Sequence, residues 1–205
     1  MTVPIGLASP DEIPACARLI AEALRNDPVV GQVVRGDRDR VKRLTALYTA
    51  ALRTGALPRG VIDVARAEPG GPIIGVAAWE GPHRSAEVWR HLLEVARYLR
   101  AIGLRHLPAA LRALGGFGDH RPKDPHWYLA DIAVGPKARG LGVGSALLLY
   151  RLAAIDAVGA PAYLEATTPA SRHLYERHGF EAAGAIDLAP GVSGTAMIRS
   201  TADRV

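Results

Sequence analysis

Residues 130–150, ADIAVGPKARGLGVGSALLLY, place three glycines at alternate positions between two apolar segments. The first segment ends at Val134 and predicts a buried strand, and the second predicts a helix from Gly140 to about Val158. The first amides of a helix have no partner inside it, and the helix dipole adds partial positive charge there. Glycines leave that backbone bare, so an anionic group can approach it closely. The stretch therefore predicts a strand, an anion-binding loop and a helix.

The residues around this loop narrow the class of anion. A nucleotide-binding P-loop requires Gly-Lys-Ser/Thr after the glycines, and that sequence is missing. A dinucleotide fingerprint requires a third Gly or Ala where Ser145 stands, although Glu165 lies about 20 residues on, as a ribose-binding acid would. Only about 60 residues follow the loop, too few to complete a doubly wound dinucleotide domain. A dinucleotide-dependent enzyme is therefore the weaker alternative.

Length and composition are typical of one soluble domain over residues 1–205. Hydrophobic residues make up 49% of the chain and charged residues 22%. The net charge of +5 comes from arginines that are scattered along the chain, so we expect no nucleic-acid partner. No signal peptide or run of about 18 apolar residues is present, so we expect no membrane partner and a cytoplasmic location.

Strand and helix patterns alternate along the chain, which predicts an α/β fold. A β-α-β unit in the C-terminal half would form its core. The patterns predict strands over 3–9, 60–67, 72–80, 127–134, 161–167, 180–188 and 194–200, helices over about 9–24, 39–53, 86–114, 140–158 and 169–179, and a loop over 27–34. Cys16 lies on the apolar face of the first helix and is expected in the core.

Two segments together resemble a known family. VGPKARGLGVGSALL is similar to the coenzyme A pyrophosphate loop of the GNAT N-acetyltransferases, whose signature Arg/Gln-x-x-Gly-x-Gly/Ala is matched by Arg139, Gly142 and Gly144. YLEATTPASRHLYERHGF resembles the strand and helix that follow this loop in the family. Within the family, HRPKDPHWYLADIAV and APAYLEATTPASRHLYERHGF resemble the corresponding stretches of the puromycin-acetylating members. The resemblance implies a GNAT fold, with a mixed sheet of about six to seven strands flanked by helices, a coenzyme A-binding core over about 127–180, and acetyl-CoA as cosubstrate.

The resemblance also implies the residues that bind the cosubstrate. Pantetheine would lie along the strand before the loop as an added strand, held by backbone groups. Ser171 stands where the family often has an asparagine that helps to hold coenzyme A. The implied contacts are Ile132, Ala133, Val134, Arg139, Gly140, Leu141, Gly142, Val143, Gly144, Ser145 and Ser171.

Acetyl transfer needs a group that takes a proton from the amine and a group that protonates the departing thiolate. By resemblance Tyr175 is the acid, because a phenol stays protonated at neutral pH. Glu165 is the preferred base, directly or through water, and Asp131 is the competing base or a group that recognises an ammonium ion. Trp127 resembles a residue that lines the substrate pocket. Strand alternation places Trp127, Leu129 and Asp131 on one face.

These residues predict direct attack of a small-molecule primary amine on acetyl-CoA in a ternary complex. Asp131 and His126 differ from the puromycin-acetylating members beside the acceptor site, so the identity of the amine stays open. A non-catalytic acyl-CoA-binding protein on the same fold is the main alternative. The seven histidines lack metal-ligand spacing, so we expect no metal. The sequence does not fix the oligomeric state, and a homodimer stays open.

Overall fold

Seven strands form one mixed sheet in the computed structural model, which describes residues 3–82, 88–108, 110–111, 120–189 and 191–200. The strand order is β1-β2-β3-β4-β5-β7-β6, and every neighbouring pair is antiparallel except β4 and β5, which are parallel. The sheet confirms the predicted GNAT-type architecture. The strands are β1 (Ile5–Leu7), β2 (Gly60–Arg66), β3 (Ile73–Glu80), β4 (Trp127–Val134), β5 (Ala162–Ala166), β6 (Glu181–Ala189) and β7 (Val192–Arg199).

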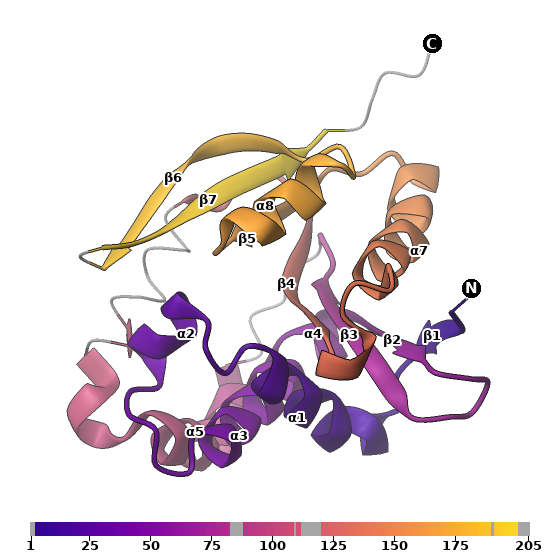
Figure 1. Cartoon of the computed structure of the whole chain (residues 1–205). Helices are drawn as coiled ribbons and strands as arrows, with labels where there is room; N and C mark the ends of the chain where they lie inside the picture. Colours follow the sequence, from indigo (N-terminus) through magenta and orange to yellow (C-terminus); the bar gives the residue numbers. More distant parts are fainter. Residues whose placement is uncertain (1–2, 83–87, 109, 112–119, 190, 201–205) are drawn as a thin grey trace.

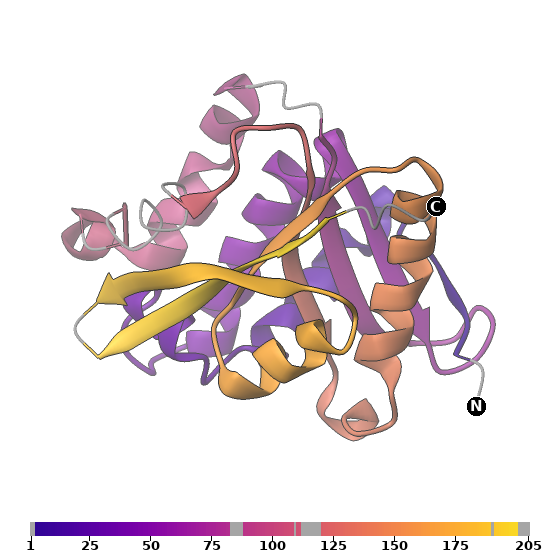
Figure 2. The ribbon, with the colours of Figure 1, turned by 90° about the horizontal axis from the view of Figure 1, so that it is seen from above.

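Helices cover both faces of this sheet. Figure 1 shows α1, α2, α3 and α5 together below the sheet, and in Figure 2 α7 and α8 lie on the opposite, upper face. The helices are α1 (Ile13–Ala23), α2 (Pro28–Val33), α3 (Arg40–Thr54), α4 (Ala56–Arg59), α5 (Val88–Ile102), α7 (Val143–Ala157) and α8 (Pro169–Glu176).

Each face of the sheet carries its own apolar core. The core under α1 and α3 contains Ile20 and Leu44, and Cys16 is fully buried in it as predicted. The core under α7 and α8 contains Trp79, Leu147 and Phe180, and these side chains are at most 2% exposed. Residues from one strand therefore belong to two separate environments, depending on the face to which they point.

The prediction of a loop over 27–34 is wrong, because α2 occupies residues 28–33. Asp27 is its N-cap, with Oδ1 accepting hydrogen bonds from the amides of Val29 and Val30 at 2.9 and 3.0 Å. Pro28 takes the first helical position, where its missing N–H costs nothing. In sequence the Asp-Pro pair is typical of a turn, but in the structure it begins the helix α2.

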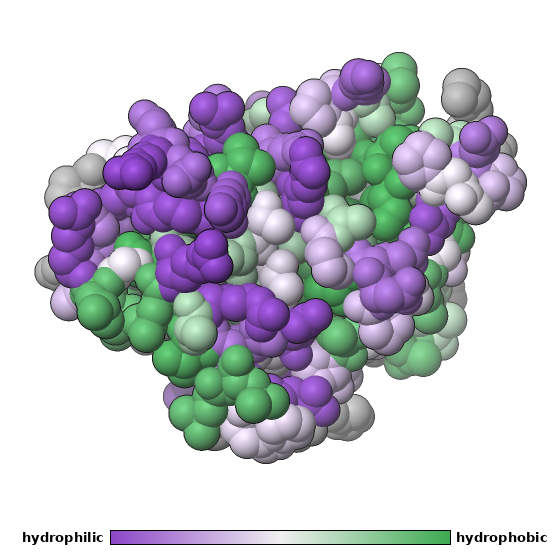
Figure 3. Space-filling view, turned by 90° about the horizontal axis from the view of Figure 1, so that it is seen from below, coloured by the Kyte–Doolittle hydropathy of each residue, from purple (hydrophilic) through white to green (hydrophobic). Residues whose placement is uncertain are grey.

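The outer helix α5 buries a charged residue and exposes apolar ones. Glu94 is buried and forms a salt bridge with Arg97, while the Tyr98 hydroxyl hydrogen-bonds Thr54 Oγ1 at 3.0 Å. Trp89 and Leu92 are exposed, and Figure 3 shows apolar side chains (green) at the lower edge of this face, where α5 lies. The rest of the predicted 86–114 helix is described only in part. Among the residues that the structure describes, no helix has both the length and the apolarity needed to cross a membrane.

Two contacts hold α7 against the sheet. A Cβ added to Gly75 of β3 would lie 2.8 Å from Val143 Cγ1, so only glycine permits this close approach. Asp63 of β2 is fully buried and accepts a hydrogen bond from Arg151 Nε at 2.9 Å, within a two-contact pair of carboxylate and guanidinium. The start of α7, where the anion site is predicted, is therefore fixed relative to β2 and β3.

We predict that Gly75→Ala lowers the free energy of unfolding by about 1–3 kcal/mol, because the added methyl overpacks the contact with Val143. Urea unfolding of the variant checks this value. The control repeats Gly75→Ala in a Val143→Ala background, where the loss caused by the added methyl should be smaller because its closest remaining contact is Leu147 Cδ1, at 3.0 Å. A loss of the same size in both backgrounds would show that the contact with Val143 does not limit the approach of α7.

Candidate active site

The two parallel strands β4 and β5 separate after a short paired segment. Their only paired residues are Trp127 with Ala162 and Tyr128 with Tyr163, at the start of each strand. Beyond this point β4 continues along β3 to Val134, and β5 continues along β7 to Ala166. The facing backbone edges are thus left without a partner strand, and such an edge can accept an extended ligand as an added strand. We call this opening the β4–β5 gap.

A bulge in β4 changes which residues face each side of the gap. Leu129 pairs with Trp79 and Asp131 pairs with Ala78, so Ala130 is an extra residue in β4. The predicted common face of Trp127, Leu129 and Asp131 is therefore wrong. Trp127 and Leu129 belong to the core under α7, while Asp131 points to the α1 and α3 side with its partner Ala78. Trp127 and Asp131 thus lie on opposite faces of β4, and a role of Trp127 in substrate binding stays a prediction from the resemblance.

The glycine loop leads into α7 as an anion site requires. Gly140 and Gly142 both have φ of 77°, in the left-handed region that favours glycine, and Gly142 is the N-cap. The helix thus begins at Val143, three residues later than predicted, because the glycines form the turn. Its first backbone hydrogen bond runs from Ala146 N to Gly142 O at 2.9 Å. The four amides of residues 142–145 therefore have no partner within the helix and carry the positive end of its dipole.

The other predicted cosubstrate residues have varied surroundings. Arg139 donates to the carbonyl of Ala23 at 3.0 Å, which ties the loop to the end of α1. Ser145 Oγ lies 2.9 Å from His178 Nε2, a contact between the start of α7 and the residues after α8. Ser171 forms a capping box with Thr168, so its hydroxyl is already bonded within the start of α8. A contact between Ser171 and coenzyme A stays a prediction from the resemblance.

Tyr175 of α8 lies on the α7 side of the gap. It is 5% exposed and packs against Phe180, with ring centroids 6.1 Å apart. Burial raises the pKa of its hydroxyl, and the charges of Asp131 and Glu165 raise it further. The hydroxyl makes no hydrogen bond to any other described residue. It is therefore a protonated donor close to the carboxylates that line the gap.

Glu165 of β5 lies on the opposite face from Tyr175, toward α2. Its Oε2 accepts a hydrogen bond from the Tyr128 hydroxyl at 2.8 Å, while its Oε1 is buried and has no hydrogen-bond partner in the described part of the chain. Burial raises the pKa of Glu165, and the hydrogen bond from Tyr128 opposes that rise. An incompletely bonded carboxylate with a raised pKa is suited to accept a proton near neutral pH.

Asp131 is the second carboxyl at this face. It is partly buried and makes no hydrogen bond within the described residues, and burial raises its pKa to about 7, with the charges of Glu80, Glu165 and Asp27 adding to the rise. A carboxyl in this environment would bind a cation readily. Among the described residues, no group of three or more histidine, cysteine or acidic side chains is placed to hold a metal ion.

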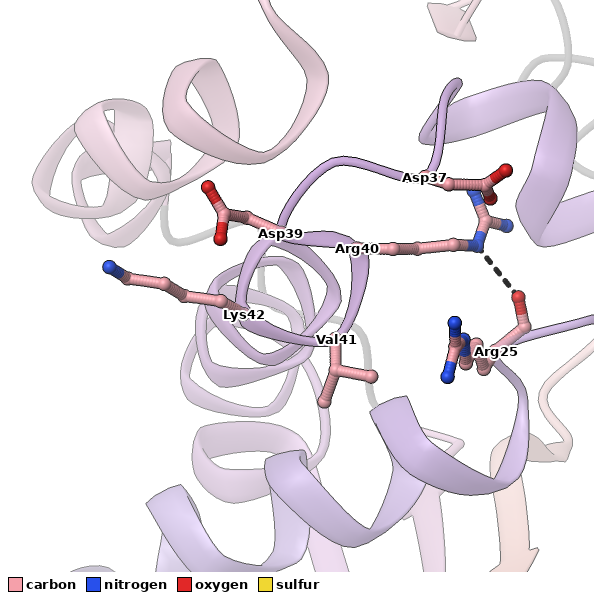
Figure 4. Close-up of a pocket in the computed structure, with 6 residues that line it drawn as sticks. All are labelled: Arg25, Asp37, Asp39, Arg40, Val41 and Lys42. Carbon is pink, nitrogen blue, oxygen red and sulfur yellow. Dashed lines mark hydrogen bonds between the residues drawn. The ribbon is translucent and has the colours of Figure 1, made fainter.

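The sequence gives little sign of two residues that shape this face, Tyr128 and Asp27. Asp27 Oδ2 accepts a hydrogen bond from Thr167 Oγ1 at 2.8 Å, so the start of α2 is joined to the end of β5. The turn before Asp27 is held in place by Arg40, whose Nε donates to the carbonyl of Arg25 at 2.7 Å, inside the pocket of Figure 4. This pocket lies at the start of α3, where Arg40 also donates to the carbonyl of Val34 at the end of α2. It is lined by Arg25, Asp37, Asp39, Arg40, Val41 and Lys42.

Comparisons with known proteins identify the relatives of this architecture. The acetyltransferase (GNAT) family profile matches residues 67–180. A Corynebacterium glutamicum crystal structure described as "histone acetyltransferase HPA2 and related acetyltransferase" is 30% identical, with 98% of each chain covered and a TM-score of 0.76. An N-acetyltransferase from Staphylococcus aureus is 19% identical, with 95% of this chain and 99% of the other covered and a TM-score of 0.63. A mosquito arylalkylamine N-acetyltransferase-like protein is 16% identical, with 97% of this chain and 100% of the other covered and a TM-score of 0.57. The last two similarities concern the fold alone.

We predict that Asp131→Asn changes the pH dependence of stability. Between about pH 4 and 7 the folded chain holds the Asp131 proton and the unfolded chain does not, so the contribution of Asp131 to stability falls as pH rises. The melting temperature of the variant, relative to the wild type, should be higher at pH 8 than at pH 4, by about 2–4 °C for about 1 kcal/mol.

Asp187→Asn, at an exposed position of the edge strand β6, is the matched control. Its melting temperature should differ from that of the wild type by the same amount at pH 4 and pH 8. If Asp131→Asn also shows the same difference in melting temperature at pH 4 and pH 8, the pKa of Asp131 is not raised in the folded chain as described above.

Proposed function

The chain is an N-acetyltransferase of the acetyltransferase (GNAT) family, and from this premise we propose that it transfers the acetyl group of acetyl-CoA to a primary amine of a small molecule. One observation carries the proposal: the β4–β5 gap joins an unpaired strand edge to four free helix amides on one side and to two carboxyls on the other. This arrangement suits a long ligand with an anionic end and a second, cationic ligand.

The donor is proposed to lie along β4 and the start of α7. The free amides of Gly142, Val143, Gly144 and Ser145 would hold the pyrophosphate, and Arg139, Gly140 and Leu141 complete the loop. Backbone groups of residues 132–134 would pair with pantetheine, because this edge of β4 has no strand beside it. A Cβ added to Gly144 would lie 3.7 Å from Val134 Cγ2 and 3.6 Å from Leu174 Cδ2, which places this glycine between β4 and α8, beside the proposed path.

The acceptor is proposed to enter from the face that carries Glu165 and Asp131. Glu165 would take a proton from the ammonium group, directly or through water, and leave a nitrogen with a free electron pair. This nitrogen would bond to the acetyl carbon while the bond from carbon to sulfur breaks, and it would release its second proton to water as the neutral amide forms. Tyr175 would give its proton to the thiolate and recover one from solvent. Asp131 would bind a positive charge of the acceptor.

The state of the single cysteine supports direct transfer without an acetylated enzyme. Cys16 is fully buried in the core under α1, and burial raises the pKa of its thiol to about 11. A buried neutral thiol is a poor nucleophile. A non-catalytic acyl-CoA-binding protein would need neither Tyr175 nor Glu165 beside the gap, so the catalytic proposal explains more of the site.

The sequence resemblance to puromycin-acetylating members suggests an aminonucleoside as one acceptor, and arylalkylamines are a second class to test. Both carry a primary amine on a ring-containing body. A cytoplasmic location remains a prediction from the sequence.

A thiol-release assay with acetyl-CoA and a panel of amines tests this proposal. The panel contains aminonucleosides, arylalkylamines, aminoglycosides, amino acids and peptide N-termini, and calorimetry measures binding of acetyl-CoA and NAD in parallel. We expect amine-dependent thiol release and tighter binding of acetyl-CoA than of NAD. Binding of acetyl-CoA without release by any amine would favour the non-catalytic alternative, and tighter binding of NAD would overturn the assignment of the donor.

We predict that Gly142→Ala weakens acetyl-CoA binding at least tenfold, because a side chain at φ of 77° distorts the turn that presents the free amides. Gly159→Ala is the matched control. Gly159 lies at the other end of α7 with φ of 62°, and a Cβ added to it would have no atom within 4 Å. Its substitution therefore imposes a similar backbone strain of about 1–2 kcal/mol without a new contact. Calorimetry should show unchanged affinity for Gly159→Ala, and equal losses in both variants would contradict the proposed pyrophosphate site.

We predict that Tyr175→Phe lowers kcat by about 10²-fold or more while the Kd of acetyl-CoA changes little, since only the proton donor is lost and the contact with Phe180 is kept. Steady-state kinetics and calorimetry measure the two quantities. Tyr150→Phe, on the exposed side of α7, should keep the wild-type kcat. Unchanged turnover in Tyr175→Phe would remove this tyrosine as the acid.

A further inference from the structure

We infer that Tyr128 is a positioning residue for Glu165, with its hydroxyl holding one carboxylate oxygen so that the other is presented to the acceptor amine. This inference rests on the proposed function, because it assigns a role to the neighbour of the proposed base. Tyr128 touches Glu165 from β4, across the part of the gap where the strands have just separated.

The two oxygens of Glu165 have different environments. Oε2 accepts the Tyr128 hydroxyl at 2.8 Å, and Oε1 is buried without a partner in the described residues. A buried carboxylate oxygen that lacks a donor is unfavourable, and proteins usually satisfy such an atom. A hydrogen of the acceptor's ammonium group, or of a water molecule that bridges the acceptor and Glu165, would bond to Oε1. The hydrogen bond from Tyr128 to Oε2 thus restrains the direction in which the base points, and the nearby Tyr163 hydroxyl also favours the charged form of Glu165.

The ring of Tyr128 contacts two neighbouring groups. The guanidinium carbon of Arg121 lies 3.3 Å from the ring centroid, and the ring of Tyr163 stacks with it at 6.1 Å. Arg121 is also within 4.0 Å of Glu80, which forms a second ion pair with Arg59 at 3.5 Å. This anchoring leaves the ring of Tyr128 little freedom to rotate away, so its hydroxyl stays directed at Glu165.

The hydrogen bond has a fixed polarity. Burial and the charge of Glu165 raise the pKa of Tyr128 well above its ordinary value, so the phenol stays protonated and always donates. Donation to the ionised carboxylate favours its charged form, as does the positive charge of Arg121, and both oppose the effect of burial on the pKa of Glu165. The charged or titratable groups that interact with Glu165 include Tyr128, Arg121, Tyr163, Glu80, Asp131 and Tyr175.

The test compares Tyr128→Phe with the wild type over a range of pH. This variant keeps the ring and its contacts but removes the donor, so the pKa of Glu165 should rise. We expect the acid limb of the profile of kcat/KM for the amine to move up by about one pH unit, which is about a tenfold loss on that limb. The Kd of acetyl-CoA should not change. Arg121→Gln should move the limb in the same direction by less.

Tyr98→Phe is the matched control, because it also removes one tyrosine hydroxyl that is hydrogen-bonded to a neighbouring side chain, here Thr54. Its acid limb should coincide with that of the wild type. A uniform loss of rate in Tyr128→Phe, with no movement of the limb, would show a merely structural role and overturn the inference.

A readout without turnover separates this inference from the proposed function. Carbon-13 NMR of labelled glutamate carboxyls gives the titration of Glu165 directly, and Glu165→Gln assigns its signal. An upward movement of the midpoint in Tyr128→Phe is expected even if no amine in the panel is acetylated, in which case only the proposed function fails. An unchanged midpoint overturns the inference, whatever the activity.

Discussion

The divergence of β4 from β5 is the constraint on which the rest of the structure depends. Two parallel strands that pair at only two positions leave backbone groups exposed in the middle of a sheet, an arrangement that proteins ordinarily avoid. Here each strand is fixed by its other neighbour, β3 for β4 and β7 for β5. The gap is therefore held open by the pairing on both sides, and a ligand with peptide-like groups can complete the hydrogen bonding.

The gap also separates two chemical environments. On one side, α7 presents free amides and α8 presents the Tyr175 hydroxyl, both supported by the apolar core that contains Trp79. On the other side, β5 presents Glu165 and the bulge in β4 presents Asp131. Donor and acceptor can thus approach the same point from opposite faces. The close contact at Gly75 and the buried Asp63–Arg151 pair keep the donor side in register with the sheet.

The features that can be predicted correctly from the sequence are those that depend on residues close together along the chain. The glycine loop, the seven strands and the order of the last β-α-β unit depend on neighbouring residues and on apolar periodicity, and the structure agrees with them. The face of Asp131 could not be predicted, because the bulge at Ala130 appears only when β3 is placed beside β4. The pairing of Tyr128 with Glu165 joins residues far apart in sequence, and nothing local marks it. The pair Asp27-Pro28 is compatible with a turn or with a helix start, and the hydrogen-bond partner of Asp27, Thr167, lies far along the chain, just after β5.

A crystal structure of the chain with acetyl-CoA tests the central claim most directly. The account predicts pyrophosphate oxygens about 3 Å from the amides of residues 142–145, with pantetheine beside Ile132–Val134 in the β4–β5 gap. The acetyl group should lie between Tyr175 and Glu165. Acetyl-CoA bound at another surface, with the gap left closed to it, would contradict the account.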